Sequence, residues 1–231
     1  MRNLWSSEKS LAAKPKNLSH PEAACIPLAA LTAWQAMVNQ GKLKPGQRVL
    51  IHAGAGGVGV AAIQIAKAFG AYVAATASTR NQDLLHELGA DLAIDYTREE
   101  IDEIKPKFDL VLDGVGKSVW ASSFRALKFG GRLVTLSPPI PDQPTGKLKF
   151  FATVVIGVAG GMVRGLAGGK RLLITMVKPR GGDLEKIGTL IEAGKVRPVV
   201  EKVFPMEQVA EAHRMSQSGH VRGKLAIRIR E

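Results

Sequence analysis

From Arg48 onward, short apolar runs alternate with longer stretches of helical pattern, and this alternation constrains the fold more than any other feature. The runs have the length of strands and few polar residues, which is typical of parallel strands covered by helices on both faces. The pattern predicts an α/β fold with a doubly wound parallel sheet. The predicted strands span residues 48–53, 72–77, 92–96, 108–115, 132–137 and 172–177. The predicted helices span residues 28–40, 57–69, 81–88, 117–127 and 183–192.

The chain after residue 199 departs from this alternation. It shows a strand pattern, then a helix over residues 206–216, then a final strand over residues 224–230. The final strand alternates apolar and polar residues, which indicates one solvated face. We therefore predict a separate, antiparallel sheet at this end of the chain.

The most apolar stretch of the chain lies at residues 150–167. Four glycines dilute it and Arg164 interrupts it. Because a membrane-spanning helix needs roughly 20 mostly apolar residues, we interpret the stretch as a buried or capping helix. Contact with a membrane surface is the less favoured interpretation.

The chain of 231 residues carries a formal net charge of +12, which raises the possibility of a nucleic-acid or membrane partner. No run of five basic residues occurs and only 5% of residues are aromatic, so a platform for stacked bases is not expected. We predict no nucleic-acid partner. The surplus of positive charge instead suits a phosphate-rich ligand.

The single cysteine, Cys25, excludes an internal disulfide, and with five scattered histidines it gives no pattern typical of a zinc site. We therefore predict no bound metal. Residues 1–15 mix charges without an apolar core, so they do not resemble a signal peptide. The expected location is the cytoplasm.

A glycine-rich loop follows the first strand and opens the next helix. Gly54, Gly56 and Gly59 satisfy the pattern GxGxxG in the context that gives it meaning. Glycines let the backbone approach a diphosphate, and the free N–H groups of a helix start face it. We predict that Gly54, Gly56, Gly57, Val58 and Gly59 bind a dinucleotide. A glycine-rich turn without a ligand is the alternative.

The end of the second strand bears on which dinucleotide is bound. In folds that bind NAD, a carboxylate lies there and bonds the ribose 2′-hydroxyl. Residues 76–81 contain no carboxylate, whereas Ser78, Thr79 and Arg80 suit a 2′-phosphate. We therefore predict NADPH rather than NADH. In the alternative interpretation, Ser78 and Thr79 cap the next helix and Arg80 is solvated.

Several segments resemble one enzyme family in the right order: LAALTAWQAM at 28–37, KPGQRVLIHAGAGGVGVAAIQIAKAFGA at 44–71, ELGADLAIDY at 87–96, DLVLDGVG at 109–116, GGRLVTL at 130–136, LIEAGKVRPVVEKVFPMEQVAEAH at 190–213 and GHVRGKLAIRI at 219–229. From about Leu18 onward, the chain is similar to the zinc-independent quinone oxidoreductase branch of the medium-chain dehydrogenases/reductases. The resemblance implies direct hydride transfer from NADPH to a quinone, an enone or a related small molecule.

The resemblance also implies cofactor contacts outside the glycine loop. Thr32 would lie near the nicotinamide ribose or phosphate and would orient the cofactor. Tyr96 would contact the adenosine phosphate end, and Lys224 belongs to a closing Gly-Lys motif. The further expected contacts, from the loops after the fourth and fifth strands, are Gly114, Val115, Ser137 and Pro138.

Family members have a Rossmann domain and a GroES-like catalytic domain, so the resemblance implies a division of the chain. Residues 1–27 resemble the tail of a truncated catalytic domain, 28–198 the dinucleotide-binding domain, and 199–231 the segment that returns to the catalytic domain. Relatives dimerise through the sixth strand, so a homodimer is a possible partner arrangement. We also expect Trp34 and Met37 to lose their cover. A weakly active or inactive NADPH-binding module, acting through a partner, is the alternative function.

Overall fold

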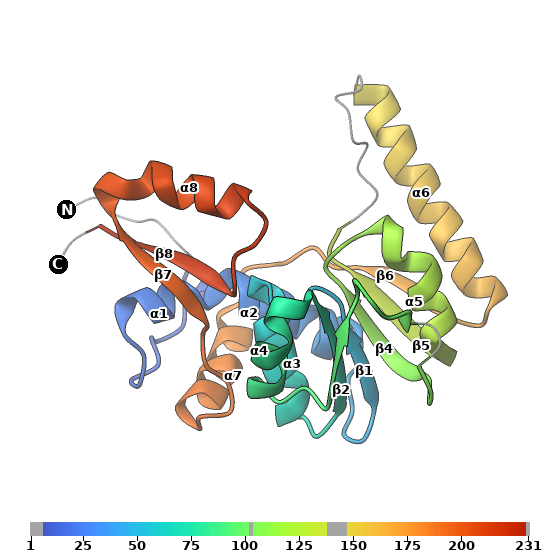
Figure 1. Ribbon diagram of the computed structural model, residues 1–231, viewed down its shortest axis with the longest axis horizontal. Helices are drawn as coiled ribbons and strands as arrows, with labels where there is room; N and C mark the ends of the chain where they lie inside the picture. The colour runs from blue at the N-terminus through green and yellow to red at the C-terminus, as the bar shows by residue number, and fades with distance from the viewer. Residues whose placement is uncertain (1–6, 102–103, 138–146, 230–231) are drawn as a thin grey trace.

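The computed structural model describes residues 7–101, 104–137 and 147–229 and combines a large α/β body with a small second sheet (Figure 1). In this described part, six parallel strands form one sheet in the order β3-β2-β1-β4-β5-β6. The order reverses between β1 and β4, so the predicted doubly wound Rossmann sheet is confirmed. The strands are β1 (Arg48–Ile51), β2 (Tyr72–Ala77), β3 (Leu92–Asp95), β4 (Phe108–Asp113), β5 (Leu127–Thr135) and β6 (Arg171–Ile174).

Helices cover both faces of the sheet because successive strand residues point to opposite sides. Val49 and Ile51 of β1 lie in one apolar cluster, whereas Leu50 lies in the other. The first cluster packs beneath α2, α3, α4 and α7, and the second beneath α5. These helices are α2 (Pro27–Trp34), α3 (Gly57–Ala68), α4 (Gln82–Glu87), α5 (Trp120–Ala126) and α7 (Gly181–Glu192).

The helix predicted over residues 28–40 is present as α2, continued by a π-helical stretch (Gln35–Gln40). Trp34 and Met37 are buried, so the expectation that they would be uncovered is wrong. Both belong to the apolar cluster that α2 shares with α3 and α7, and the Trp34 ring meets the Phe69 ring edge to face at 5.6 Å. The packing of α2 against α3 and α7 therefore keeps Trp34 and Met37 buried.

The second sheet pairs β7 (Val200–Pro205) with β8 (Lys224–Arg228), beside α1 (His20–Ala24). The two strands are parallel, so the predicted antiparallel sheet is wrong. The connection between them contains α8 (Val209–Gln217), which returns the chain to the level at which β7 starts, and a helical crossover joins parallel strands. The alternation of polar and apolar residues predicts that one face of β8 is solvated, but it does not predict whether β8 runs parallel or antiparallel to β7.

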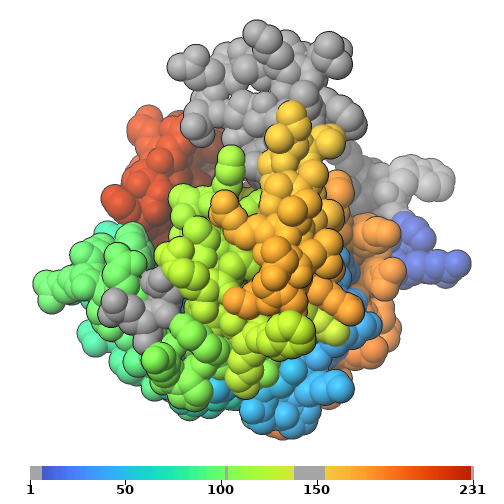
Figure 2. Space-filling model, turned by 90° about the vertical axis from the view of Figure 1, so that its right-hand side faces the viewer, coloured from blue at the N-terminus to red at the C-terminus, as the bar shows by residue number. Residues whose placement is uncertain are grey.

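The apolar stretch near residue 150 lies in α6 (Lys147–Ala167), which projects from the end of the body opposite to α8 (Figures 1 and 2). Among its residues 154–167, only Gly161 and Gly165 are buried, so the helix is not buried; it covers Leu172, Trp120 and Phe124 at the edge of the body with one side only. A Cβ atom on Gly161 would lie 2.6 Å from Leu172 Cδ2, so the helix approaches the body through its glycines. Its larger side chains face outward. Within the described residues, no helix has the length and apolar character needed to cross a membrane.

Two phenylalanines allow a matched test of the core. Phe108 on β4 is fully buried, whereas Phe129 on β5 is 88% exposed. We expect Phe108→Ala to lower the free energy of unfolding by about 3–5 kcal/mol, since it leaves a cavity, and Phe129→Ala to change it by less than about 0.5 kcal/mol. Urea unfolding followed by circular dichroism measures both. Equal losses in the two variants would contradict this packing.

Candidate functional site

The glycine loop joins β1 to α3 at the point where the strand order reverses. Gly56 is the N-cap residue of α3 and no side chain caps the helix, so the first N–H groups of α3 are left for another acceptor. A Cβ atom on Gly59 would lie 2.2 Å from the carbonyl oxygen of Ala53, and one on Gly54 would lie 2.8 Å from Leu85 Cδ2. Gly59 therefore lets α3 approach the end of β1 closely, and Gly54 lets the loop pass close to α4 and β2. Gly56 is less crowded, because its nearest neighbour would lie at 3.3 Å.

Lys224 lies directly over the start of α3. A Cβ atom on Gly57 would lie 2.4 Å from Lys224 Cε and 2.8 Å from its Nζ. The ammonium group therefore lies beside the positive end of the helix dipole, and no carboxylate in the described part of the chain pairs with it. Two like charges at this distance favour an anion between them. The structure thus brings a residue of β8 to the glycine loop, next to Gly57.

The second sheet is fixed to the loop by its backbone. The N–H of Gly223 donates to the carbonyl oxygen of Ala55 at 2.8 Å, and Gly56 pairs with Gly223 in a parallel bridge. Gly223 has a φ of +64°, and an added Cβ atom would lie 2.2 Å from the Val199 carbonyl oxygen. Only glycine fits there, and this geometry sets the position of Lys224.

The residues after β2 form contacts that differ from helix capping. Ser78 makes no capping bond to the following turn, and its hydroxyl instead accepts from Asn81 Nδ2 at 3.3 Å. Thr79 Oγ1 donates to Asp95 Oδ2 at 2.5 Å. Hydrogen bonds from Thr79 and Thr97 hold the pKa of Asp95 below its usual range. The hydroxyl proton of Thr79 is therefore engaged with the Asp95 carboxylate at the end of β3.

Two arginines gather at the same turn from distant parts of the chain. Arg80 donates to the carbonyl oxygen of His220, and Arg222 donates to that of Arg80. Arg222 Nε also donates to Asn81 Oδ1 at 2.8 Å. The sequence prediction missed Arg222. Its position two residues before Lys224 is the signal that could have indicated it.

A buried carboxylate organises the loops that follow β4 and β5. Asp113 Oδ1 accepts from the N–H groups of Val115 at 2.8 Å and Gly116 at 2.9 Å. Its Oδ2 accepts from Trp120 Nε1 and from Thr135 Oγ1, both at 2.8 Å. All four bonds are made by one fully buried side chain. Sequence reasoning missed Asp113, although a carboxylate at the end of an apolar strand is a signal that it has dedicated partners.

Thr135 extends this organisation to the next predicted residue. Its Oγ1 donates its one proton to Asp113 and accepts from the N–H of Ser137 at 3.1 Å. A Cβ atom on Gly114 would lie 3.8 Å from Ala53 Cβ, so the loop after β4 lies against the glycine loop. Gly114, Val115 and Ser137 are thereby held at the carboxyl ends of neighbouring strands. Pro138 lies outside the described residues.

Two further predicted residues lie at the periphery. Thr32 is half-buried on α2, and its hydroxyl donates to the Leu28 carbonyl oxygen one turn earlier at 2.7 Å. Tyr96 follows β3 and is 62% exposed. The structure therefore leaves the Tyr96 ring accessible and engages the hydroxyl of Thr32 with its own helix.

His52 lies beneath the glycine loop and is packed. Its Nε2 lies 3.0 Å from Ser123 Oγ and its Nδ1 lies 3.3 Å from Thr76 Oγ1. Burial lowers its pKa from 6.5 to about 4, against the opposing charge of Asp113. The imidazole is therefore neutral near pH 7 and links β1 to β2 and α5. Among the described residues, no group of three His, Cys, Asp or Glu side chains is arranged to hold a metal ion.

The chain is similar to one family of known proteins. A profile of zinc-binding dehydrogenases matches residues 88–227. The chain is similar to NAD(P)H oxidoreductase RTN4IP1, mitochondrial, of Danio rerio, with 40% identity over 97% of the chain and 61% of that relative. It is also 37% identical to NADPH-dependent alkenal/one oxidoreductase, chloroplastic, of Arabidopsis thaliana, over 95% of the chain and 50% of that relative. The chain thus spans about half to three fifths of the length of these curated relatives.

Solved structures show the same similarity. The quinone oxidoreductase from Coxiella burnetii superposes with a TM-score of 0.79 and 35% identity, over 94% of this chain and 63% of that one. The similarity therefore extends over both sheets of the described structure.

One expectation is corrected by these relatives. Those from zebrafish, mouse, human and cattle are named as mitochondrial, and the Arabidopsis relative as chloroplastic. These names point away from the expected cytoplasmic location, which is therefore wrong. It rested on composition and a charged N-terminal segment, neither of which reports an organelle.

The buried imidazole makes the stability of the protein depend on pH. Between pH 6.5 and pH 4, the unfolded chain binds a proton at His52 that the folded chain does not. Stability is therefore present above pH 6.5 and is lost as the pH falls. We expect the free energy of unfolding to drop by about 2 kcal/mol between pH 7 and pH 5 from this group alone. Urea unfolding over this range measures the slope.

Two histidine variants separate His52 from the rest of the protein. His52→Gln, although less stable at every pH, should lose this part of the slope. His213→Gln, on the exposed side of α8, should keep it. An unchanged slope in His52→Gln would contradict the assignment.

Proposed function

The chain belongs to the zinc-binding dehydrogenase family of the medium-chain dehydrogenases/reductases, and on this basis we propose that it is an NADPH-dependent reductase of quinones or enones. The observation that carries the proposal is the position of Lys224 over Gly57, at an uncapped helix start. Hydride transfer in this proposal needs no zinc. The names of the Arabidopsis and Coxiella relatives support this substrate class.

The glycine loop fits the diphosphate of the cofactor. The N–H groups of Gly57, Val58 and Gly59 are the free donors of the first turn of α3, and the helix dipole adds to their attraction for an anion. The Lys224 ammonium supplies a full positive charge on the side of the second sheet. Gly54 and Gly59 keep helix and strand close enough for these donors to converge.

The preference for NADPH rests on the turn after β2. Ser78, Arg80 and Arg222 provide one hydroxyl and two guanidinium groups for a 2′-phosphate. Thr79 adds its backbone N–H, because its hydroxyl is donated to Asp95. That bond, together with Arg98 at 3.8 Å, keeps the Asp95 carboxylate occupied. Tyr96 offers an exposed ring beside the adenosine end.

The remaining predicted residues suit the nicotinamide end. When bound, the cofactor supplies the hydride. Asp113 holds the backbone of Val115, and through Thr135 that of Ser137, so two walls of the crevice keep one geometry. Gly114 allows close approach to the glycine loop, and Thr32 orients the cofactor from α2. A quinone takes its proton from water, so this chain needs no dedicated acid.

In this proposal the chain is divided by role. Residues 28–198 bind the dinucleotide, and residues 199–231 return toward the substrate side, where residues 1–27 also belong. The backbone bond from Gly223 to Ala55 supports this division, because it joins the two parts at the diphosphate.

Lys224→Gln tests the diphosphate site. We expect NADPH to bind at least about tenfold more weakly, since a charge-assisted hydrogen bond to phosphate is removed. Isothermal titration calorimetry measures the affinity. Lys186→Gln, at an exposed position of α7, is the matched control and should bind as the wild type does. Equal affinities in the two variants would remove the main support for the proposal.

Turnover of NADPH with a simple quinone, such as phenanthrenequinone, tests the reaction itself. Oxidation of NADPH that depends on the quinone supports the reductase. Tight NADPH binding without turnover of quinones or enones would instead favour a binding module. The chain covers only 61% and 50% of the length of the two relatives, and this short span supports that alternative.

Arg222→Gln tests cofactor choice. We expect the affinity for NADPH to fall by about tenfold or more and the affinity for NADH to stay within about twofold, because only NADPH carries the 2′-phosphate. The ratio of the two affinities separates phosphate recognition from local distortion. Since Arg222 also braces Arg80 and Asn81, a structural effect would weaken both cofactors equally, and that outcome would contradict the proposed role.

A further inference from the structure

The outward face of α6 is a continuous apolar stripe. Its members are 44–72% exposed and recur at helical spacing, so they lie on one side of the helix. They are Val155, Ile156, Met162, Val163 and Leu166. The opposite side approaches the body through glycines: an added Cβ atom on Gly161 would lie 2.7 Å from the Trp120 ring, and one on Gly165 would lie 3.3 Å from the Phe124 ring. The helix thus turns its larger side chains to solvent, and Figure 2 shows it as a ridge on this face.

The chain around this stripe carries only positive charge. Residues 143–182 contain no Asp or Glu and seven Lys or Arg residues. The basic residues are Lys147, Lys149, Arg164, Lys170, Arg171, Lys178 and Arg180. A run of 40 residues with this bias is unusual in a chain that has 20 carboxylates elsewhere. An apolar stripe within a basic segment that lacks carboxylates has the composition of a helix that lies on an anionic lipid surface.

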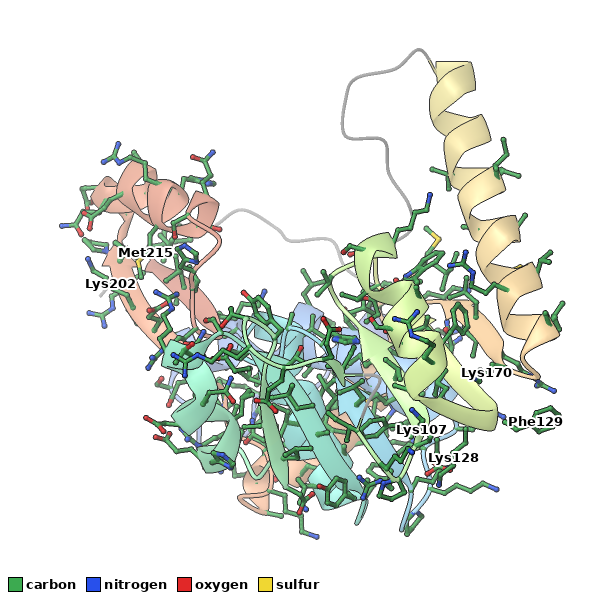
Figure 3. All side chains as sticks on the ribbon, turned by 45° about the vertical axis from the view of Figure 1, so that its right-hand side comes forward. Lys107, Lys128, Phe129, Lys170, Lys202 and Met215 are labelled. Carbon is green, nitrogen blue, oxygen red and sulfur yellow. The ribbon has the colours of Figure 1, made fainter. Side chains whose placement is uncertain are left out.

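The C-terminal end of α6 also combines an exposed apolar side chain with nearby basic residues. Phe129 is 88% exposed and stacks over Gly169, where an added Cβ atom would lie 2.0 Å from its ring. Figure 3 shows Lys107, Lys128 and Lys170 near this ring. Lys128 pairs with Asp109 at 2.9 Å, and Lys170 donates to the carbonyl oxygen of Phe124. Burial, and then the nearby Lys107 cation, lower the pKa of Lys170. A projecting aromatic ring and nearby amines suit the boundary between headgroups and acyl chains.

We propose that the outward face of α6, together with Phe129, is a docking surface for an anionic phospholipid bilayer. The apolar stripe enters the acyl boundary with the helix lying in the plane of the membrane, and the basic residues meet the headgroups. From the sequence alone, membrane contact was the less favoured interpretation, because the helix was expected to be covered by the protein. The exposed apolar stripe now favours membrane contact.

Charge favours a bilayer over a second copy of this chain as the occupant. Two copies meeting stripe to stripe would bring two carboxylate-free basic segments together, and like charges in an interface are unfavourable. An anionic bilayer instead offers phosphates to each cation. The surface is separate from the dinucleotide site, so the proposal stands independently of the proposed function.

Vesicle flotation tests the surface directly. The full chain is mixed with vesicles of phosphatidylcholine alone, or with about a third of the lipid replaced by phosphatidylglycerol. We expect binding to the second kind only, weakened at about 1 M salt, where the Debye length falls to about 3 Å. Absence of binding to anionic vesicles at low salt would overturn the proposal.

A matched pair of variants assigns the binding to α6. Val163→Glu/Leu166→Glu should reduce the vesicle-bound fraction at least about tenfold, since it buries two charges in the acyl boundary. Leu11→Glu/Met206→Glu adds the same charge at exposed apolar positions elsewhere and should bind nearly as the wild type does. Equal losses would overturn the proposal. So would light scattering that shows a wild-type dimer without vesicle binding, made monomeric only by the α6 variant, because the face would then join two copies.

Discussion

The structure depends on one close approach, in which α3 leaves the end of β1 with no side chain between them. The carbonyl oxygen of Ala53 occupies the space where a Cβ atom of residue 59 would lie, so only glycine permits the contact. This approach aims the free N–H groups of α3 at the crevice where the strand order reverses. The loop then carries the second sheet, through the bond from Gly223 to Ala55. The free N–H groups of α3 and the Lys224 ammonium converge for this reason.

A second constraint acts on the loops after β4 and β5. Asp113 is fully buried and accepts four hydrogen bonds, two of them from backbone N–H groups and two from side chains. A buried carboxylate with fewer partners would be costly, so the loops after β4 and β5 are held together by the need to satisfy it. His52 supports the same region in its neutral form, through hydroxyl groups of Thr76 and Ser123. Polar residues below the crevice thus fix its shape.

Periodicity and glycine spacing were enough to predict the parallel sheet and the glycine loop, because both depend on local sequence. The direction of β8 was not predictable from its alternation, since burial of one face is the same in parallel and antiparallel pairs. Arg222 and Asp113 were missed because their partners are distant in sequence or are backbone groups. The exposure of α6 was missed because apolar content indicates burial, and only the structure shows that its glycines are the inward residues.

The joint between the two sheets has a mechanical consequence. Lys224 belongs to β8 of the second sheet and Gly57 to α3 of the body. An anion held between them would therefore contact both parts of the structure. In the described residues, the two parts are joined in this region by the Gly223–Ala55 hydrogen bond, the Gly56–Gly223 bridge and the hydrogen bonds of Arg80 and Arg222. In the proposed function, a bound dinucleotide would add contacts to both parts at once, so the second sheet would be held more firmly against the body when the crevice is filled.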